Sequence, residues 1–250
     1  MHTYKGTSFA EAYQKSLIDL MDNGDLCETR GTTSRELLNV SLEITDPSQC
    51  MYTNMTRSTQ AKYIAAEFLW YYAGRNDVAF ISKYAKFWEQ IQNPNGTANS
   101  AYGNLIFKPK SLGGITQYEW AIASLAKDKD SRQAILHFNT PEHQYSGNKD
   151  FVCTMYGIFH IRHNKLHFSV YMRSNDAIWG TPTDVAFFCS LQMQALAHLK
   201  EFYPELELGS YTHHANSYHI YDRHYDLVSR MLVGEFVPSR LPSIKTNLVS

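Results

Sequence analysis

The stretch MRSNDAIWGTPTDVAFF, residues 172–188, lies where a strand pattern gives way to a helix pattern. Before it, KLHFSVYMRS (165–174) alternates apolar and polar residues, which is typical of a strand with one buried face. After it, DVAFFCSLQMQALAHLKEFYP (184–204) predicts a long helix that stops near Pro204. Strands combined with long helices favour an α/β or α+β sheet domain.

The rest of the chain shows the same mixture. Residues 7–24 and 58–74 carry apolar side chains at helical spacing, and Ser58 or Thr59 is expected to cap the second helix, with Gly74 at its end. Strand patterns cover 31–45, 130–139 and 151–164, and a last helix is expected to begin near Tyr221.

Composition narrows the class of protein. Hydrophobic residues make up 44% of the chain and charged residues 19%, as in globular domains. The net charge of -1 gives no electrostatic argument for a nucleic-acid or membrane partner. We see no internal repeat, linker, signal pattern or long apolar run, so we expect one cytoplasmic domain over residues 1–250.

The four cysteines show no C-x-x-C spacing and are expected to be reduced thiols: Cys27, Cys50, Cys153 and Cys189. Cys153 shares a predicted strand face with Phe151, Met155 and Phe159, which favours a small core residue. The alternative is a nucleophile, which requires a cation beside the sulfur. Arg132 and Arg173 are the candidates.

Residues 151–164 and 165–174 are predicted to form a hairpin across His163, Asn164 and Lys165. In the second strand the even-numbered residues from 166 to 172 are apolar, and the odd-numbered residues end at Arg173. An arginine at a strand end is either an anion anchor, because its donors match phosphate, or one partner of a surface salt bridge.

A series of short motifs then occurs in one order along the chain. Together they resemble the thymidylate synthase family over roughly residues 5–235, which implies a large mixed β-sheet packed against long helices in a single catalytic domain. The motifs are Arg30-Gly-Thr-Thr-Ser, Glu67-Phe-Leu-Trp-Tyr-Tyr-Ala-Gly, Trp88, Asn99-x-x-Tyr102-Gly103, Asp130-Ser131-Arg132, Cys153, Arg173-Ser174-x-Asp176-x-x-x-Gly180-x-Pro182-x-Asp184 and His219-x-Tyr221-x-x-His224.

Several positions depart from the usual family pattern. Thr154 replaces a His after the cysteine, Met172 replaces a Gln, and Asp184 replaces an Asn. Ile91 stands for a second Trp and Gln133 for a second Arg, and the end of the chain lacks the usual closing tail. At these positions the chain is similar to the deoxycytidylate (dCMP) hydroxymethylases of T-even phages. By analogy, modified phage DNA would be its natural setting.

The resemblance implies a defined chemistry. Cys153 would add to C6 of a pyrimidine, which makes C5 nucleophilic toward the methylene group of 5,10-methylenetetrahydrofolate. Water would then complete a hydroxymethyl group, where a synthase would deliver hydride and make a methyl group. No metal is implied.

Asp184 has the clearest physical interpretation. Cytosine offers an N4 donor and an N3 acceptor, the reverse of uracil, and a protonated carboxyl can match both. Mismatched buried polar groups give discrimination on the order of a thousandfold or more. The alternative from the residues alone is that Asp184 caps a helix starting at Val185.

The resemblance also implies roles for the remaining residues. Glu67, an acid among apolar residues of a helix, would organise water and proton transfer. Arg132 would reach the site of a partner subunit, which implies a homodimer. Arg30, Arg132, Arg173 and Ser174 would bind the phosphate, His219 and Tyr221 the sugar, Asp176 the folate ring, and Trp88 and Tyr102 would line the folate and base pocket. From the residues alone, the aromatic side chains are equally well explained as core.

Other functions stay open. Relatives of the same family would make 5-methyl-dCMP or thymidylate, or would act on ribose CMP. A catalytically silent nucleotide-binding protein is a further alternative. A metal site is an alternative role for the histidines at 213, 214, 219 and 224. We disfavour it because no second cluster of ligand-type residues has matching spacing.

Overall fold

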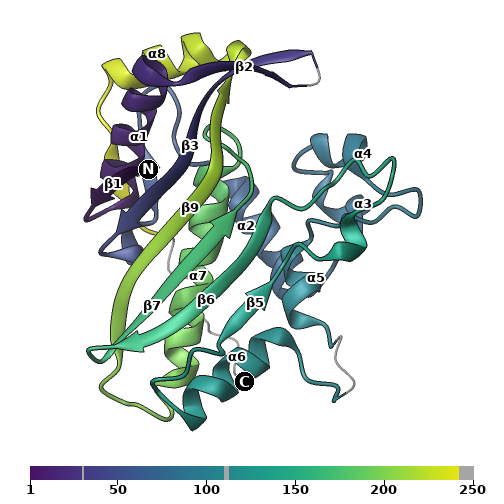
Figure 1. The fold of residues 1–250 in the computed structure, drawn as a ribbon, viewed down its shortest axis with the longest axis vertical. Coiled ribbons are helices and arrows are strands. Elements are labelled where there is room, and N and C mark those ends of the chain that lie inside the picture. The colour runs from purple at the N-terminus through teal and green to yellow at the C-terminus, as the bar shows by residue number, and fades with distance from the viewer. Residues whose placement is uncertain (30, 110–112, 242–250) are drawn as a thin grey trace.

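A mixed β-sheet runs through the molecule (Figure 1), and the computed structural model describes residues 1–29, 31–109 and 113–241. The β1–β3 and β7–β9 pairs are parallel, β8 pairs with β9 in parallel, and the other pairs in this sheet are antiparallel. In spatial order the strands are β1 (His2–Gly6), β3 (Thr32–Ile44), β9 (Glu207–Tyr221), β7 (Lys165–Met172), β6 (Thr154–Arg162) and β5 (Ile135–His137), with β2 (Asp25–Thr29) beside β3 and β8 (Asn175–Asp176) beside β9.

Helices pack against this sheet, which confirms the predicted fold class. Figure 1 shows α7 behind the central strands, and α7 contacts β7 and β9. The helices are α1 (Phe9–Asn23), α2 (Ala61–Tyr72), α3 (Val78–Ile81), α4 (Phe87–Ile91), α5 (Tyr102–Phe107), α6 (Gln117–Lys127), α7 (Thr181–Leu199) and α8 (Tyr225–Val233); short 3₁₀ turns are η1 (Pro47–Gln49), η2 (Pro141–His143) and η3 (Asp222–His224), and β4 (Met51–Thr53) pairs with β10 (Val237–Ser239).

The alternation in β7 places its apolar side chains in the core, as predicted. Leu166, Phe168, Val170 and Met172 are all buried. Phe168 stacks on Phe159 of β6 and meets Phe188 of α7 edge-on. Burying each such side chain stabilises the fold by about 1.5–3 kcal/mol, so this layer holds α7 against the sheet.

The hairpin prediction is confirmed, but the face predicted for Cys153 is wrong. His163 and Asn164 both have positive φ, as a two-residue turn between twisted strands requires. β6 begins at Thr154, and a register shift between Thr154 and Tyr156 interrupts the alternation. Cys153 therefore precedes the strand and does not share the buried face of Phe159.

Helix α7 begins three residues earlier than predicted and ends at Leu199. Pro182 lies in its first turn, where a missing N–H costs nothing. The backbone N–H of Asp184 donates to the carbonyl of Gly180 at 2.9 Å, so Asp184 is inside the helix. The alternative interpretation of Asp184 as a helix cap is therefore wrong.

Helix α2 begins at Ala61, and neither predicted cap is used. The hydroxyls of Ser58 and Thr59 accept instead from the backbone N–H groups of Asn54 and Tyr52. The predicted end is confirmed: Gly74 has φ of 61°, and its N–H donates to the carbonyl of Tyr71.

The C-terminal half contains a strand that the sequence did not predict. β9 has 15 residues and runs through Tyr221, where we expected a helix to start; the chain then turns through η3 into α8 at Tyr225. Its outward residues are polar, and histidines interrupt its apolar pattern, which hid the strand. The strand expected over 130–139 is limited to Ile135–His137, and β1 was also not predicted.

Candidate active site

Strand ends from distant parts of the chain meet at one place in the sheet. The N–H of Arg173, just after β7, donates to the carbonyl of Cys153 at 2.9 Å. The N–H of Ser217 in β9 donates to the carbonyl of Arg173 at 3.2 Å. Asp176 of β8 pairs with His219 of β9. Strand pairing thus brings four predicted site residues together: Cys153, Arg173, Asp176 and His219.

The half-buried thiol of Cys153 has a cationic neighbour. Nη2 of Arg173 lies 3.5 Å from Sγ. The same guanidinium donates to the carbonyls of Phe151 at 2.6 Å and Val152 at 3.2 Å, and it packs over the Phe151 ring. A fixed positive charge favours the thiolate over the thiol. Arg173 therefore meets the condition that a nucleophilic Cys153 requires.

Arg132 does not reach this site within one chain. It is exposed, and the neighbouring Asp130 carbonyl accepts from Arg162 at the far end of β6. Cys153 precedes the near end of that nine-residue strand, so the two lie roughly 30 Å apart along the sheet. Arg30, the other predicted phosphate residue, lies outside the described residues.

Asp184 projects from the first turn of α7 toward Asn175. Nδ2 of Asn175 donates to its Oδ2 at 2.8 Å. Removal from solvent raises the pKa of Asp184 to about 7, although the Asn175 hydrogen bond opposes this and nearby Asp176 adds to it. Asp184 is therefore a mixture of acid and carboxylate near neutral pH.

Glu67 is a second carboxyl group close to Asp184. It is only 5% exposed, and the phenol of Tyr63, one helical turn earlier in α2, donates to its Oε1 at 2.7 Å. Burial, opposed by the Tyr63 hydrogen bond and assisted by the negative charge on Asp184, raises the pKa of Glu67 to about 8. Nε1 of Trp88 donates to the Tyr63 oxygen at 2.9 Å, which connects α4 to this acid.

Tyr102 is a neighbour of both the thiol and the acids. Its ring is buried and stacks on Tyr71 with centroids 5.4 Å apart. A Cβ at Gly103 would lie 1.8 Å from the Tyr71 carbonyl oxygen, so only glycine permits this approach of α5 to α2. Burial raises the pKa of Tyr102, and the charges of Asp184 and Cys153 raise it further. Cys153 and Asp184 therefore belong to one site.

The predicted sugar residues lie at the end of β9. The His219 ring is 9% exposed, and its Nδ1 has no hydrogen-bond partner within the described part of the chain. Burial lowers the pKa of His219, which keeps the ring neutral at pH 7. The Tyr221 ring packs edge-on against it at 5.0 Å. Ser174 is half-buried beside Arg173.

The predicted folate residues differ in how accessible they are to a ligand. Asp176 is half-buried, and its Oδ1 accepts the N–H groups of Ile178 at 2.7 Å and Trp179 at 3.0 Å. This carboxylate beside the half-exposed Trp179 indole suits a flat ring with amino and N–H donors. Trp88 is only 7% exposed and its N–H is used by Tyr63, so it shapes the site from within the core.

Four residues of the site were given no role in it from the sequence: Tyr63, Asn175, Thr181 and His213. Tyr63 stands four residues before Glu67 on a helix, a spacing that places the two on one face and could have identified it. Asn175 lies within the quoted stretch, and Thr181 and His213 both contact its Oδ1. His213 belongs to β9, the unpredicted strand.

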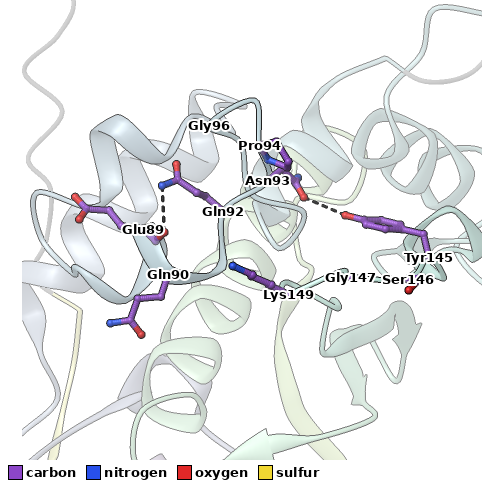
Figure 2. A pocket seen from close by; sticks show the side chains of 10 residues that line it. All are labelled: Glu89, Gln90, Gln92, Asn93, Pro94, Gly96, Tyr145, Ser146, Gly147 and Lys149. Atoms are coloured by element: carbon purple, nitrogen blue, oxygen red, sulfur yellow. Dashed lines mark hydrogen bonds between the residues drawn. The ribbon is translucent and has the colours of Figure 1, made fainter.

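A separate cavity of about 550 Å³ lies between the end of α4 and the segment 145–149 (Figure 2). The Tyr145 hydroxyl donates to Asn93 across it at 3.0 Å, and Lys149 lies along it. None of the predicted site residues lines this cavity, so we do not connect it with the chemistry above.

The described residues contain no group of three or more His, Cys, Asp or Glu side chains arranged to hold a metal ion. Within the same ranges, no helix has the length and apolar character needed to cross a membrane.

Comparison with known proteins places this site in a family. A model of thymidylate synthase matches residues 11–249. The deoxyuridylate hydroxymethyltransferase of Bacillus phage SP01 is 29% identical over 236 residues, 88% of this chain but only 59% of that protein. The deoxycytidylate 5-hydroxymethyltransferase of Enterobacteria phage T6 is 32% identical over 174 residues, covering 67% of this chain and 70% of that protein. A thermostable thymidylate synthase A from Bacillus subtilis superposes with a TM-score of 0.75 at 25% identity, covering 91% of this chain and 84% of that one. The chain belongs to the thymidylate synthase family.

Proposed function

We propose that this chain is a deoxycytidylate 5-hydroxymethyltransferase. It would convert dCMP, 5,10-methylenetetrahydrofolate and water to 5-hydroxymethyl-dCMP and tetrahydrofolate. The observation that carries the proposal is Asp184: its carboxyl group has a pKa of about 7, and Tyr102 is a neighbour of both Asp184 and the candidate nucleophile.

Cys153 is the proposed nucleophile. Its sulfur adds to C6 of the pyrimidine, and the electrons of the C5–C6 double bond become available at C5. Arg173 supports this step because its guanidinium lies 3.5 Å from the sulfur. The folate supplies the one-carbon unit to C5. Loss of the C5 proton and expulsion of tetrahydrofolate leave an exocyclic methylene on C5. Water adds to that carbon, and expulsion of the sulfur from C6 then restores the aromatic ring.

Asp184 is the proposed reader of the base. In its protonated form it donates to N3 of cytosine and accepts from N4. A pKa of about 7 keeps a substantial protonated fraction at neutral pH, which an ordinary aspartate would not retain.

Glu67 is the proposed proton carrier. With a pKa of about 8, it is mainly protonated at pH 7 and can exchange protons with water at the reacting edge. Two neighbouring carboxyl groups resist ionising together, which keeps at least one proton in the site.

The remaining predicted residues complete the proposal. Asp176, Trp88 and Tyr102 serve the folate and base pocket, His219 and Tyr221 the sugar, and Arg30, Arg132, Arg173 and Ser174 the phosphate. A homodimer is part of the proposal because Arg132 is exposed and distant from Cys153 in one chain. The sheet face opposite α7 offers a surface, on which Tyr171 stacks between Tyr156 and His214.

One observation favours a second candidate, hydroxymethylation of dUMP. The phage SP01 relative is named for deoxyuridylate, and its similarity covers 88% of this chain. A neutral carboxyl group could also match uracil if the proton moved to its other oxygen. Substrate preference therefore depends on what surrounds Asp184.

The test is turnover of dCMP and of dUMP in separate assays with the folate. We expect faster turnover of dCMP and no dihydrofolate, because only a hydride step oxidises the folate. Faster turnover of dUMP would refute the substrate, and dihydrofolate formed in step with product would indicate a methyltransferase. Release of the C5 hydrogen, abolished in Cys153→Ser, excludes a silent binding protein.

A further inference from the structure

Three buried side chains form a continuous line that ends on the half-buried Asp184. The Tyr211 hydroxyl lies 2.8 Å from Nδ1 of His213. Nε2 of His213 lies 3.0 Å from Oδ1 of Asn175. Nδ2 of Asn175 lies 2.8 Å from Oδ2 of Asp184. Tyr211 and His213 come from β9, Asn175 from β8 and Asp184 from α7, so three elements contribute.

The protonation states of Tyr211 and His213 determine which group donates and which accepts at each contact in this line. Burial lowers the pKa of His213 to about 3, so the ring is neutral and carries one N–H. Burial raises the pKa of Tyr211, so its phenol keeps its proton. Within the described residues, His213 is the hydrogen-bond partner of that phenol. A buried O–H with one partner donates to it, so Tyr211 donates to Nδ1.

The orientation of the Asn175 amide follows from the donors on either side of it. Because Nδ1 accepts, Nε2 carries the ring proton and donates to the Asn175 carbonyl oxygen. The hydroxyl of Thr181 also contacts that oxygen, which reinforces the orientation of the amide. The amide nitrogen of Asn175 must then face Asp184, and Oδ2 is an acceptor.

We infer that Tyr211, His213 and Asn175 are positioning residues that set substrate preference, by holding the proton of neutral Asp184 on Oδ1. Oδ2 accepts from Asn175, and a carboxyl oxygen that carries the proton is a poorer acceptor than its partner. The acid then has one fixed donor oxygen and one fixed acceptor oxygen. Asp184 also keeps some accessible surface, so part of its carboxyl group can meet a ligand.

This inference rests on the proposed function and deepens it. Uracil requires the opposite arrangement of donor and acceptor from cytosine at the same edge. Without the line, Asp184 could exchange the two oxygens and serve either base. With it, uracil meets a donor where it offers a donor, and rejection follows from that mismatch.

The experiment compares His213→Phe with His213→Gln. The Phe variant removes the donor to Asn175, whereas the Gln variant keeps a side-chain N–H. We expect the ratio of kcat/KM for dCMP to that for dUMP to fall about tenfold in His213→Phe, and to remain nearer wild type in His213→Gln. The ratio of the two nucleotide dissociation constants, measured by calorimetry without folate, should fall in parallel.

Two further variants guard against a folding artefact. Tyr211→Phe removes one hydroxyl without adding volume and should lower the same ratio by a smaller factor. Tyr118→Phe is the matched control, because it removes another tyrosine–histidine contact, 3.0 Å from His198 near the other end of α7. It should leave the ratio unchanged.

The outcomes separate the two proposals. A wild-type enzyme that prefers dUMP defeats the proposed function. A wild-type enzyme that prefers dCMP, with the same ratio in His213→Phe and Tyr211→Phe, defeats the positioning inference alone. Equal losses for both nucleotides would indicate a purely structural role for His213 and would also overturn it.

Discussion

Glu67 and Asp184 are neighbouring carboxyl groups with raised pKa values, but they are supported in different ways. Glu67 receives its hydrogen bond from Tyr63, one turn away in the same helix. Asp184 receives its hydrogen bond from Asn175, which strand pairing orients through His213. The single Tyr63 hydrogen bond leaves the proton of Glu67 able to exchange. The hydrogen bonds through Asn175 and His213 instead determine which oxygen of Asp184 donates and which accepts. We therefore assign proton transfer to the first acid and base selection to the second.

Asp184→Asn is the substitution from which we expect the largest effect on activity. A carboxamide cannot transfer a proton to N3 of cytosine and take it back during the reaction, whereas a neutral carboxyl group can do both. We expect kcat/KM for dCMP to fall on the order of a thousandfold, while kcat/KM for dUMP falls far less or rises. Steady-state kinetics with both nucleotides measures this, and unchanged turnover of dCMP would show that Asp184 does not read the base.

Glu67→Gln should behave differently. Removing a proton carrier slows the chemical step whichever base is bound, so kcat should fall about a hundredfold for both nucleotides. The preference for dCMP over dUMP should stay as in the wild type. If preference changed instead of rate, the roles of the two acids would be the reverse of those assigned here.

The pH dependence of stability should carry the signature of Glu67. Its pKa of about 8 in the folded state exceeds its unfolded value of about 4.5, so the folded protein binds the proton more tightly. Stability from this proton is complete below pH 4.5 and is lost as pH rises through 8. Between pH 5 and 7, wild type should lose about 2 kcal/mol more than Glu67→Gln. Urea unfolding at several pH values measures the difference, and parallel curves would contradict the burial of this acid.

Tyr63→Phe should have a smaller effect. The Tyr63 hydrogen bond stabilises the charged form of Glu67, so its loss should raise the pKa of Glu67. We expect kcat to fall about tenfold, and the pH at which Glu67 ionises in the rate profile to move upward. Tyr72→Phe is the control: Tyr72 is the last residue of the same helix, and its phenol lies 2.9 Å from the hydroxyl of Ser190 in α7. A profile that moved downward, or equally in both variants, would contradict this role.

The sequence predicted the Glu67 side of this comparison better than the Asp184 side. Helical periodicity placed Glu67 among apolar residues, and the acid four residues after Tyr63 follows from helix geometry alone. The strip of β7 that ends at Arg173 was equally readable, because period-two alternation reports one buried face. Arg173 was one of two candidate cations for Cys153, and the sequence did not decide between it and Arg132 because side-chain placement is not visible in the pattern.

The support of Asp184 was hidden for the same reason. His213 and Tyr211 lie in β9, which pairs with β3 and β7. Histidines and serines in β9 interrupt the apolar alternation by which a strand is recognised in sequence. The true start of α7 at Thr181 was also missed, because Gly180 and Pro182 read as a loop. Together these placed Asp184 outside the helix, at a cap, when it lies in the first turn and bonds Asn175.

The most direct test of the central claim is a competition between equal amounts of dCMP and dUMP in one reaction with 5,10-methylenetetrahydrofolate and heavy-oxygen water. Mass spectrometry of the nucleotides then identifies base and added group together. The account predicts 5-hydroxymethyl-dCMP as the dominant product, with its new oxygen derived from the labelled water. Dominant hydroxymethyl-dUMP, or a methylated nucleotide without the label, would contradict it.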